Sequence, residues 1–303
     1  KGLIANNKYV GKGTTTLYYG LYANYPNNTR IYNNTAFVSN SYTSNYAFEA
    51  YMSGYSGNEI KNNLGINIGG GTGAYLYNVS SSNNTSDYNN WYSSSTSNPF
   101  VYNGTTYTSF NAFRGAYGDD KNSLSYDPGL KFDGTPNPLD PGVWAVNGRG
   151  VQIAGNAADI DGNPRPTLEA NGVPDLGAIE TVPQCEPPLA VPVNPPVVGG
   201  KQYFTFGFDT VAAINWNATL GLTAPLEVRQ YSGAKAPGFS LISPTKFMYF
   251  YTDVQPMGGL TTFDYNAEIY YKDPWRGTMP TEANIKLAEL MNGTWYAYNG
   301  SNS

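Results

Sequence analysis

The sequence predicts an all-β protein in two parts. A right-handed parallel β-helix with a C-terminal cap is expected over residues 1–182 and a β-sandwich over residues 201–303, with a Pro-rich linker over residues 183–200. Three observations predict this fold class. The first third of the chain repeats a motif every 27 to 29 residues, the repeat carries no helical pattern, and short segments alternate apolar and polar residues.

A motif of the form I-x-N-N marks the repeat. It occurs at Ile4–Asn7, Ile31–Asn34 and Ile60–Asn63, and Asp87–Asn90 continues it without the Ile. The starts are 27, 29 and 27 residues apart. That is the size of one coil of a parallel β-helix, in which successive coils stack about 4.8 Å apart. We therefore expect Ile4, Ile31 and Ile60 to form one column.

The paired asparagines of the motif acquire a structural role in such a stack. They are Asn6 and Asn7, Asn33 and Asn34, and Asn62 and Asn63. In register, their amides can hydrogen-bond to the backbone at the bend and to the equivalent Asn above and below. A propeller blade needs about 40 residues and a leucine-rich repeat needs a Leu scaffold, so both alternatives fit less well.

A second alternating stretch follows about 15 residues after each Ile, at Leu17–Tyr22, Tyr46–Met52 and Ala74–Val79. Alternation at period two is typical of strands. If Glu49 faces water, its neighbours at even spacing face inward. This phase predicts the inward residues Tyr46, Phe48 and Ala50 in the second stretch, Tyr19, Leu21 and Ala23 in the first, and Tyr75, Tyr77 and Val79 in the third.

The period fades after Ser93. Residues 94–126 keep short aromatic strands at Phe100–Tyr102 and Thr106–Phe110, whereas residues 127–180 are rich in Gly, Pro and Asp. We interpret residues 127–180 as irregular final coils and a cap, because a solenoid end has to cover its open core and its strand edges.

Three motifs follow one another in this region: N-S-L-S-Y-D-P-G at Asn122–Gly129, D-I-D-G-N-P-R at Asp159–Arg165 and P-D-L-G-A-I-E at Pro174–Glu180. Their succession resembles the closing signature of right-handed parallel β-helix proteins on the surface of Gram-negative bacteria, which commonly read D-G-x-x-R and then D-x-G-A-x-E. The resemblance covers roughly residues 1–182 and implies this fold, followed by adhesin-like or anchoring modules. It implies no activity, because the same scaffold carries lyases, hydrolases and inert stalks.

Residues 183–200 contain six prolines and end in Gly199–Gly200, which predicts an extended, semi-rigid spacer. Beyond Tyr203 about seven short strands at regular spacing predict the sandwich. Their alternating residues are Phe204, Phe206 and Phe208; Leu226 and Val228; Phe247, Tyr249 and Tyr251; Phe263, Tyr265, Ala267 and Ile269; Ile285–Leu290; and Trp295–Tyr298. Asn292–Gly293 between the last two runs predicts a hairpin.

This closing hairpin is similar to that of sandwich repeats in large secreted bacterial proteins, which reads L-x-L-x-x-x-x-G-x-W. Ile285, Leu287, Gly293 and Trp295 hold those places. Such proteins often leave the cell by type IX secretion, so the resemblance implies that route. Because the chain opens at Lys1 without a Met or an apolar export segment, we expect any export signal to have been removed or to lie outside this sequence.

Composition excludes several functions. The 303 residues include no His and one Cys, which rules out Ser-His-Asp and Cys-His sites and Cys-rich zinc sites. A net charge of −5 makes the chain a poor partner for nucleic acid. The sequence has no run of about 18 apolar residues, so membrane insertion of this segment is not expected. Charged residues reach only 13%, and 27 Tyr and 34 Gly give a composition typical of extracellular β-rich proteins. The lone Cys185 argues against a disulfide-stapled fold.

Tyr88, Trp91 and Tyr92, beside the last Asn pair, form a candidate carbohydrate-binding patch, because the apolar faces of aromatic rings bind sugar rings. The alternative is that these rings pack along the core. Lys272, Trp275 and Arg276 in the sandwich have the same two interpretations.

No catalytic residue is assigned. Acids are sparse between residues 1 and 126, where a polysaccharide lyase or hydrolase would need clustered carboxylates. The adjacent Asp119 and Asp120 are expected to be ordinary solvated residues of a turn, or to point to opposite faces of a strand.

Asp159, Asp161 and Asn163 resemble the opening of a calcium loop, where alternate oxygens converge on the ion. The bidentate Glu expected eleven residues after Asp159 is missing, because Ala170 stands there. The favoured alternative is a turn of the cap, in which side chains pair with one another or with the backbone; its members are Asp161, Arg165, Asp175 and Glu180. No cofactor is therefore expected, and calcium is the one candidate ion.

Asp209–Val211 resembles the D-T-hydrophobic O-glycosylation acceptor of some secreted bacterial proteins, which makes Thr210 a candidate for modification. The alternative is an unmodified strand residue.

These observations predict a non-catalytic structural or adhesive module of a large secreted bacterial cell-surface or filament protein, with an extracellular location. Its partners would be neighbouring copies, other surface proteins or glycans. Two alternatives remain: a polysaccharide-active lyase or hydrolase on a β-helix scaffold, and a carbohydrate-binding module that uses exposed Tyr and Trp.

Overall fold

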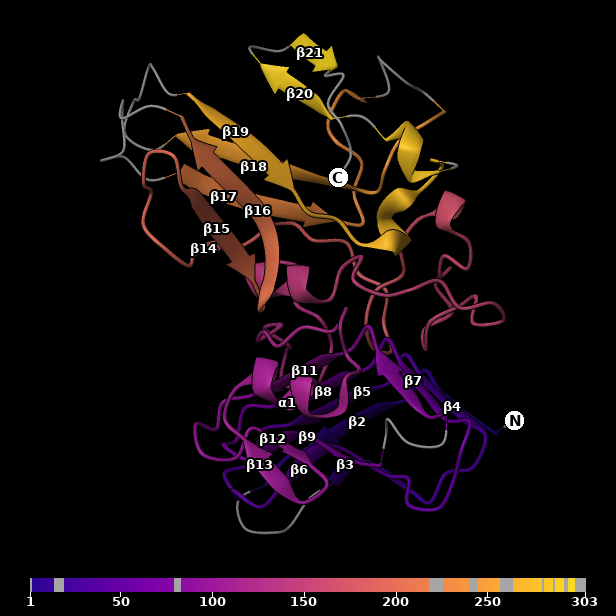
Figure 1. Ribbon diagram of the computed structural model, residues 1–303. Coiled ribbons are helices and arrows are strands. Elements are labelled where there is room, and N and C mark those ends of the chain that lie inside the picture. Colours follow the sequence, from indigo (N-terminus) through magenta and orange to yellow (C-terminus); the bar gives the residue numbers. More distant parts are fainter. Residues whose placement is uncertain are drawn as a thin grey trace.

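The computed structural model confirms an all-β fold, with 38% of residues in strands and 9% in helices. A parallel β-helix fills the lower half of Figure 1 and antiparallel sheets fill the upper half. The structure describes residues 2–13, 19–78, 83–217, 226–239, 245–256, 264–279, 281–285, 287–291 and 294–297. Leu17, Val79, Phe263, Asn292, Gly293 and Tyr298, named above, lie outside these residues. Within the described ranges no helix has the length and apolar character needed to cross a membrane.

Each coil adds one strand to each of three parallel sheets, here called sheets A, B and C. Sheet A contains β1 (Gly2–Ala5), β4 (Thr29–Tyr32), β7 (Glu59–Lys61) and β10 (Thr85–Asp87). Sheet B contains β2 (Lys8–Gly11), β5 (Thr35–Val38), β8 (Leu64–Asn67) and β11 (Asn90–Ser93). Sheet C contains β3 (Tyr19–Asn24), β6 (Tyr46–Tyr51), β9 (Thr72–Tyr77) and β12 (Phe100–Tyr102), to which β13 (Thr105–Tyr107) pairs antiparallel. The strand order follows the chain, as the repeat predicts.

The predicted isoleucine column is confirmed in sheet A. Ile4 pairs with Ile31 and Ile31 pairs with Ile60, and all three contact the core inside the coils. In the fourth coil Ser86, not Asp87, stands opposite Ile60, so the fourth copy of the motif is Ser86–Asn89 and the prediction of Asp87–Asn90 is wrong by one residue. Each fully buried Ile contributes about 1.5–3 kcal/mol, so the column is a main source of stability in this part of the chain.

A ladder of asparagines runs through the coils, built by the second Asn of the pair in the first three coils and by Asn89 in the fourth. Asn7 Nδ2 donates to Asn34 Oδ1 at 2.9 Å, Asn34 Nδ2 to Asn63 Oδ1 at 3.0 Å, and Asn63 Nδ2 to Asn89 Oδ1 at 3.1 Å. Each of these acceptor oxygens also receives the backbone N–H of the Asn in the preceding coil. The ladder therefore supplies hydrogen-bond acceptors to the backbone N–H groups at the corner of each coil, as predicted from the paired asparagines.

The bend itself is made by the residue before each rung of the ladder, which is the first Asn of the pair in three coils and Tyr88 in the fourth. Asn6, Asn33, Asn62 and Tyr88 all adopt the left-handed conformation, with φ of 56°, 51°, 58° and 57°. Asparagine tolerates this region better than most side chains, because its amide can bond locally. The repeated Asn-Asn thus combines a residue for the turn with a residue for the ladder.

Sheet C confirms the inward positions of Leu21, Ala23, Phe48 and Ala50 in the first two coils, but not those of Tyr19 and Tyr46, and it corrects the phase of the third coil. Phe48 and Ala50 are fully buried in the core inside the coils, where Leu76 also lies. Tyr75 pairs with Glu49, and Tyr77 pairs with Tyr51. The third stretch is therefore shifted by three residues from the predicted match, and this odd number exchanges its inward and outward residues. Tyr19 and Tyr46, also predicted inward, stack on each other in an outer row with Tyr75.

Sheet B separates two apolar cores. Ala36 joins the core inside the coils, whereas the adjacent Phe37 joins a second core on the outer face. Trp91 points inward over Gly65, where a Cβ would lie 2.7 Å from the indole ring. Gly65 is thus the small residue that makes room for the largest side chain of the inner core.

A short helix, not a strand, closes the fourth coil. The strand predicted at Thr106–Phe110 ends at Tyr107 as β13, and α1 (Phe110–Tyr117) follows. Ser109 caps the helix by accepting from Ala112 N, and Gly118 ends it at φ 81°. Phe110, Phe113 and Tyr117 share one face, which packs onto the inner core.

Residues 127–182 lie along the side of the coils rather than over their end. Their helical turns are η1 (Pro141–Ala145) and η2 (Glu169–Asn171). Asn156 bonds Asn6 and Asn33, Val151 N donates to Asn62, and Gly177 N donates to the carbonyl of Asn62. Because one segment crosses three coils, it ties them together and covers the outer face of sheet B.

Residues 183–200, predicted as a spacer, pack against their neighbours. Trp144 Nε1 donates to the carbonyl of Cys185 at 2.9 Å, and Ala190 N donates to Val228 O at 2.8 Å. β14 (Val191–Pro192) then pairs with β15 as an edge strand. The apolar core of sheet B's outer face therefore continues into the second part of the chain.

The second part consists of antiparallel sheets, as predicted. One contains β14, β15 (Lys201–Phe206), β16 (Asp209–Trp216) and β19 (Tyr265–Ile269); another contains β17 (Leu226–Ser232) and β18 (Phe250–Pro256). The closing hairpin pairs β20 (Ala288–Met291) with β21 (Thr294–Ala297). The turns η4 (Asp273–Arg276) and η5 (Glu282–Asn284) precede it. Phe208, predicted in a strand, instead lies in the β15–β16 turn at φ 75°.

Candidate functional site

The predicted aromatic patch does not form one surface. Trp91 is 0% exposed and its Nε1 donates to Asp120 Oδ2 at 2.9 Å. Tyr92, the next residue in β11, points to the opposite side and packs on the outer core of sheet B. Tyr88 occupies the corner that Asn holds in the other coils. Alternation within a strand separates these side chains, so the packing interpretation holds for Trp91.

The candidate calcium loop is a hydrogen-bonded turn. Asp159 Oδ1 accepts from the backbone N–H groups of Asp161 and Asn163 at 2.9 and 2.8 Å. Its Oδ2 accepts from Asn163 Nδ2 and Glu180 N at 3.0 and 2.9 Å. Burial alone would raise the pKa of Asp159, but these four donors lower it. Among the described residues no group of three or more Cys, Asp or Glu side chains is placed to hold a metal ion.

Three of the four predicted cap residues form a buried network. Arg165 pairs with Glu180 and donates to Asp175 O at 3.1 Å. The Asp175 carboxylate accepts from Gly148 N at 2.8 Å and Thr181 N at 2.7 Å. Asp161 stays outside this network, and its backbone N–H serves the Asp159 turn. These contacts hold the side segment together.

The sandwich candidates are packing residues. Thr210 is partly buried within β16, and its neighbour Asp209 pairs with Lys272 at 2.6 Å. Trp275 is buried and its Nε1 donates to Gly148 O at 2.8 Å, while Arg276 lies 3.5 Å from Glu169. These contacts attach the second part of the chain to the first. Modification of Thr210 stays a prediction.

The outer face of sheet C is the site that the structure adds. We call it the tyrosine face, formed by Tyr19, Tyr22, Tyr46, Glu49, Tyr51, Tyr75 and Tyr77. In register, Tyr22 pairs with Glu49 and Glu49 with Tyr75 across three coils. Rings of Tyr19 and Tyr46 stack 5.5 Å apart, and those of Tyr51 and Tyr77 stack 4.3 Å apart. In Figure 1 this sheet lies on the side of the coils away from the antiparallel sheets.

Glu49 is the single acid of the tyrosine face. Although it points outward, the rings around it leave the residue only 8% exposed. No hydrogen bond or ion pair to its carboxylate occurs among the described residues. Burial raises the pKa of Glu49 to about 7. The pKa values of Tyr22 and Tyr75 are raised in turn, first by burial and then by the Glu49 charge.

Glu49→Gln should stabilise the protein above pH 7. The unfolded chain loses the Glu49 proton near pH 4.5 and the folded chain near pH 7. Between these values ionisation favours the unfolded chain, so the free energy of unfolding falls as pH rises and stays reduced above pH 7. The shift bounds the gain at about 3 kcal/mol, which solvent screening reduces to about 1–2 kcal/mol.

Urea unfolding of both proteins at pH 5 and pH 8 measures this gain. The exposed Glu186→Gln serves as the control and should match the wild type at both pH values. A Glu49→Gln advantage that is equal at the two pH values would contradict a buried, titrating Glu49.

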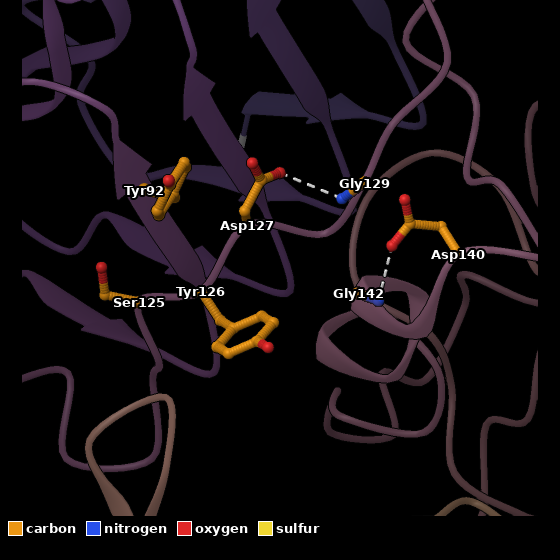
Figure 2. Close-up of a pocket in the computed structure, with 7 residues that line it drawn as sticks. All are labelled: Tyr92, Ser125, Tyr126, Asp127, Gly129, Asp140 and Gly142. Atoms are coloured by element: carbon orange, nitrogen blue, oxygen red, sulfur yellow. Dashed lines mark hydrogen bonds between the residues drawn. The ribbon is translucent and has the colours of Figure 1, made fainter. Parts of the chain in front are cut away.

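A second feature is a surface hollow beside sheet B, with a volume of about 420 Å³ (Figure 2). Its lining includes Tyr92, Tyr126, Asp127 and Asp140. One oxygen of each carboxylate is fixed by a backbone N–H, from Gly129 at 3.0 Å and from Gly142 at 2.8 Å. The two acids and two phenols could hydrogen-bond to a hydroxylated molecule that enters the hollow.

Sequence reasoning missed the tyrosine face, although a signal for it exists. Tyr22, Glu49 and Tyr75 would have aligned had the third coil been matched three residues earlier. Comparison of the chain with protein-family models, curated proteins and solved structures gives no match.

Proposed function

We propose that the chain is a non-catalytic structural and adhesive module of a large secreted protein at a bacterial cell surface or in a surface filament. The single observation that supports it best is the tyrosine face, an aromatic surface in register across three coils. Extended exposed aromatic surfaces are characteristic of binding sites. Its partners would be glycans, other surface proteins or neighbouring copies, and type IX secretion would be the export route.

The frame behind this face suits a structural role. The asparagine ladder joins every coil to the next through buried hydrogen bonds, and residues 127–182 tie the same coils together from the side. A frame of this kind keeps the outward residues in fixed positions, which favours binding by a preformed surface.

A polysaccharide-active enzyme is the second candidate, because Asp127 and Asp140 both line the hollow in Figure 2. Two carboxylates are the minimum set for acid/base cleavage of a glycosidic bond.

Incubation with polygalacturonate and alginate separates the two candidates. We expect no new reducing ends and no unsaturated uronate over the background of a heat-treated sample. Turnover that Asp127→Asn or Asp140→Asn abolishes would overturn the structural proposal and assign the hollow as an active site. If both variants cleave the polysaccharides at the wild-type rate, the activity comes from a contaminating enzyme. Further purification should then remove it, and activity that stays with the protein would overturn the structural proposal.

A further inference from the structure

The tyrosine face differs from the other two faces of the coils in charge and in cover. The outer face of sheet B is buried beneath residues 127–182 and the antiparallel sheets. The outer face of sheet A carries the charged cluster of Arg30, Glu59 and Lys61. Among the described residues of sheet C, the outward side chains are tyrosines, Asn24, Val101, Thr106 and Glu49, and none of these is cationic. A ligand of this face therefore meets rings, hydroxyls and one acid.

Glu49 gives this face a polar centre that has no partner. The residue is only 8% exposed, its carboxylate oxygens keep some contact with solvent, and no described residue supplies a hydrogen bond or an opposite charge to them. Buried polar groups in proteins are nearly always paired, so an unpaired one commonly marks a place where a ligand completes the set. Tyr22 on β3, Tyr75 on β9 and Tyr46 on its own strand surround the carboxyl, with Tyr19 beside them.

The rings differ in how much of their surface is available. Tyr46 is enclosed between Tyr19 and Tyr75. At the edge of the sheet Tyr22 is 49% exposed and Tyr25 is 48% exposed. The edge rings can therefore stack on a ligand, while the inner rings present their hydroxyls.

We propose that the tyrosine face binds a neutral polysaccharide chain, of which a sugar ring stacks on Tyr22 and hydroxyls hydrogen-bond to Glu49. The ring of Tyr19 is already stacked between Tyr22 and Tyr46 and supports this platform from behind. Sugar rings combine an apolar face with a rim of hydroxyls, which matches a surface of aromatic rings around one hydrogen-bonding group. An acidic polysaccharide would find no cation here. This inference rests on the proposed function and names the ligand of its adhesive surface.

The buried carboxyl adds a pH dependence to this binding. A sugar that covers Glu49 removes its remaining water and so favours the uncharged acid, which both donates and accepts hydrogen bonds. Because burial raises the pKa of Glu49 to about 7, affinity should fall as pH rises through that value. Glu49→Gln, which keeps a neutral donor and acceptor, should bind without this dependence.

The test is affinity electrophoresis and titration calorimetry of the whole chain with hydroxyethylcellulose, laminarin and mannan, against polygalacturonate and chitosan as charged probes. We expect at least one neutral probe to bind and both charged probes to fail. Tyr22→Ala should weaken binding about tenfold. Tyr203→Ala is the matched control, because Tyr203 is 38% exposed on β15, in the antiparallel sheets. Both variants should unfold at the wild-type temperature, since each ring is largely exposed.

Several outcomes overturn the inference. They are failure of all three neutral probes, equal losses in Tyr22→Ala and Tyr203→Ala, and a pH dependence that persists in Glu49→Gln. Sedimentation of the free protein adds one more: dimers that Tyr22→Ala dissociates would show the face to be an interface between copies. If no neutral probe binds and no acidic polysaccharide is cleaved, this inference alone is contradicted. Cleavage of the acidic polysaccharides would contradict the proposed function.

Discussion

Asp120→Asn is expected to lower the free energy of unfolding by about 3–5 kcal/mol, because it breaks a buried charge-assisted network. Asp120 is 0% exposed and ends the asparagine ladder by accepting from Asn89 Nδ2 at 3.1 Å. Its carboxylate also accepts from Trp91, Ser86, Tyr117 and Ser123. An amide of the same shape offers one acceptor oxygen and turns two N–H donors toward the remaining donors.

Asp119→Asn is the matched control for this substitution. The Asp119 carboxylate is only partly buried and receives one backbone N–H, from Ser86 at 3.2 Å. We expect a loss of less than about 1 kcal/mol there. Equilibrium unfolding in urea compares the two variants. Similar losses would show that Asp120 does not terminate the ladder.

Asn63→Ala should destabilise the protein by about 3–4 kcal/mol, since it removes a middle rung of the ladder. Asn63 Nδ2 donates to Asn89 Oδ1 and to the carbonyls of Ile31 and Lys61, at 2.9–3.1 Å. Asn63 Oδ1 accepts from the backbone N–H and the amide of Asn34, both at 3.0 Å. Alanine leaves these buried backbone groups without a partner.

Asn27→Ala provides the comparison for Asn63→Ala. Asn27 is an exposed asparagine of the same region, and we expect its replacement to change stability by less than about 0.5 kcal/mol. Thermal unfolding followed by circular dichroism reports both. If Asn63→Ala unfolds within a degree or two of Asn27→Ala, the ladder does not stabilise the coils.

The repeat could be predicted from sequence because stacking places equivalent residues in equivalent surroundings. Ile4, Ile31 and Ile60 form the column that their spacing implies, and the ladder through Asn34 and Asn63 follows from the same register. The stacking of the coils causes both the period in the sequence and the repeated hydrogen bonds between coils. The closing Asn-Gly hairpin was predictable for a local reason, namely turn chemistry.

Other features depend on contacts that no local pattern encodes. Asp120 looks like half of a solvated acidic pair, but the fold surrounds it with five side-chain donors. Residues 127–182 read as a cap because their Gly and Pro exclude regular strands. Their position beside sheet B is set by distant partners such as Asn33 and Asn62. The helix at Phe110–Tyr117 is too short to show a strong period.

The candidate binding residues illustrate the same limit. Tyr88, Trp91 and Tyr92 are close in sequence, yet alternation sends Trp91 and Tyr92 to opposite sides of β11. The tyrosine face unites residues from three coils, so it emerges only when the register between coils is known. A three-residue shift in the third coil, which also exchanges the two faces of the strand, hid the alignment of Glu49 with Tyr75.

The side segment also sets an order of events during synthesis. Coils can stack as they leave the ribosome, but the partners of Asn6 and Asn62 come 152 and 89 residues later in the chain. Phe37, Leu64 and Ile66 stay uncovered until then, although the finished protein buries them. At about 5–20 residues per second, these intervals last on the order of 5–30 s. During these intervals the nascent chain therefore exposes the apolar outer face of sheet B. This is the stage at which a holding chaperone would bind it.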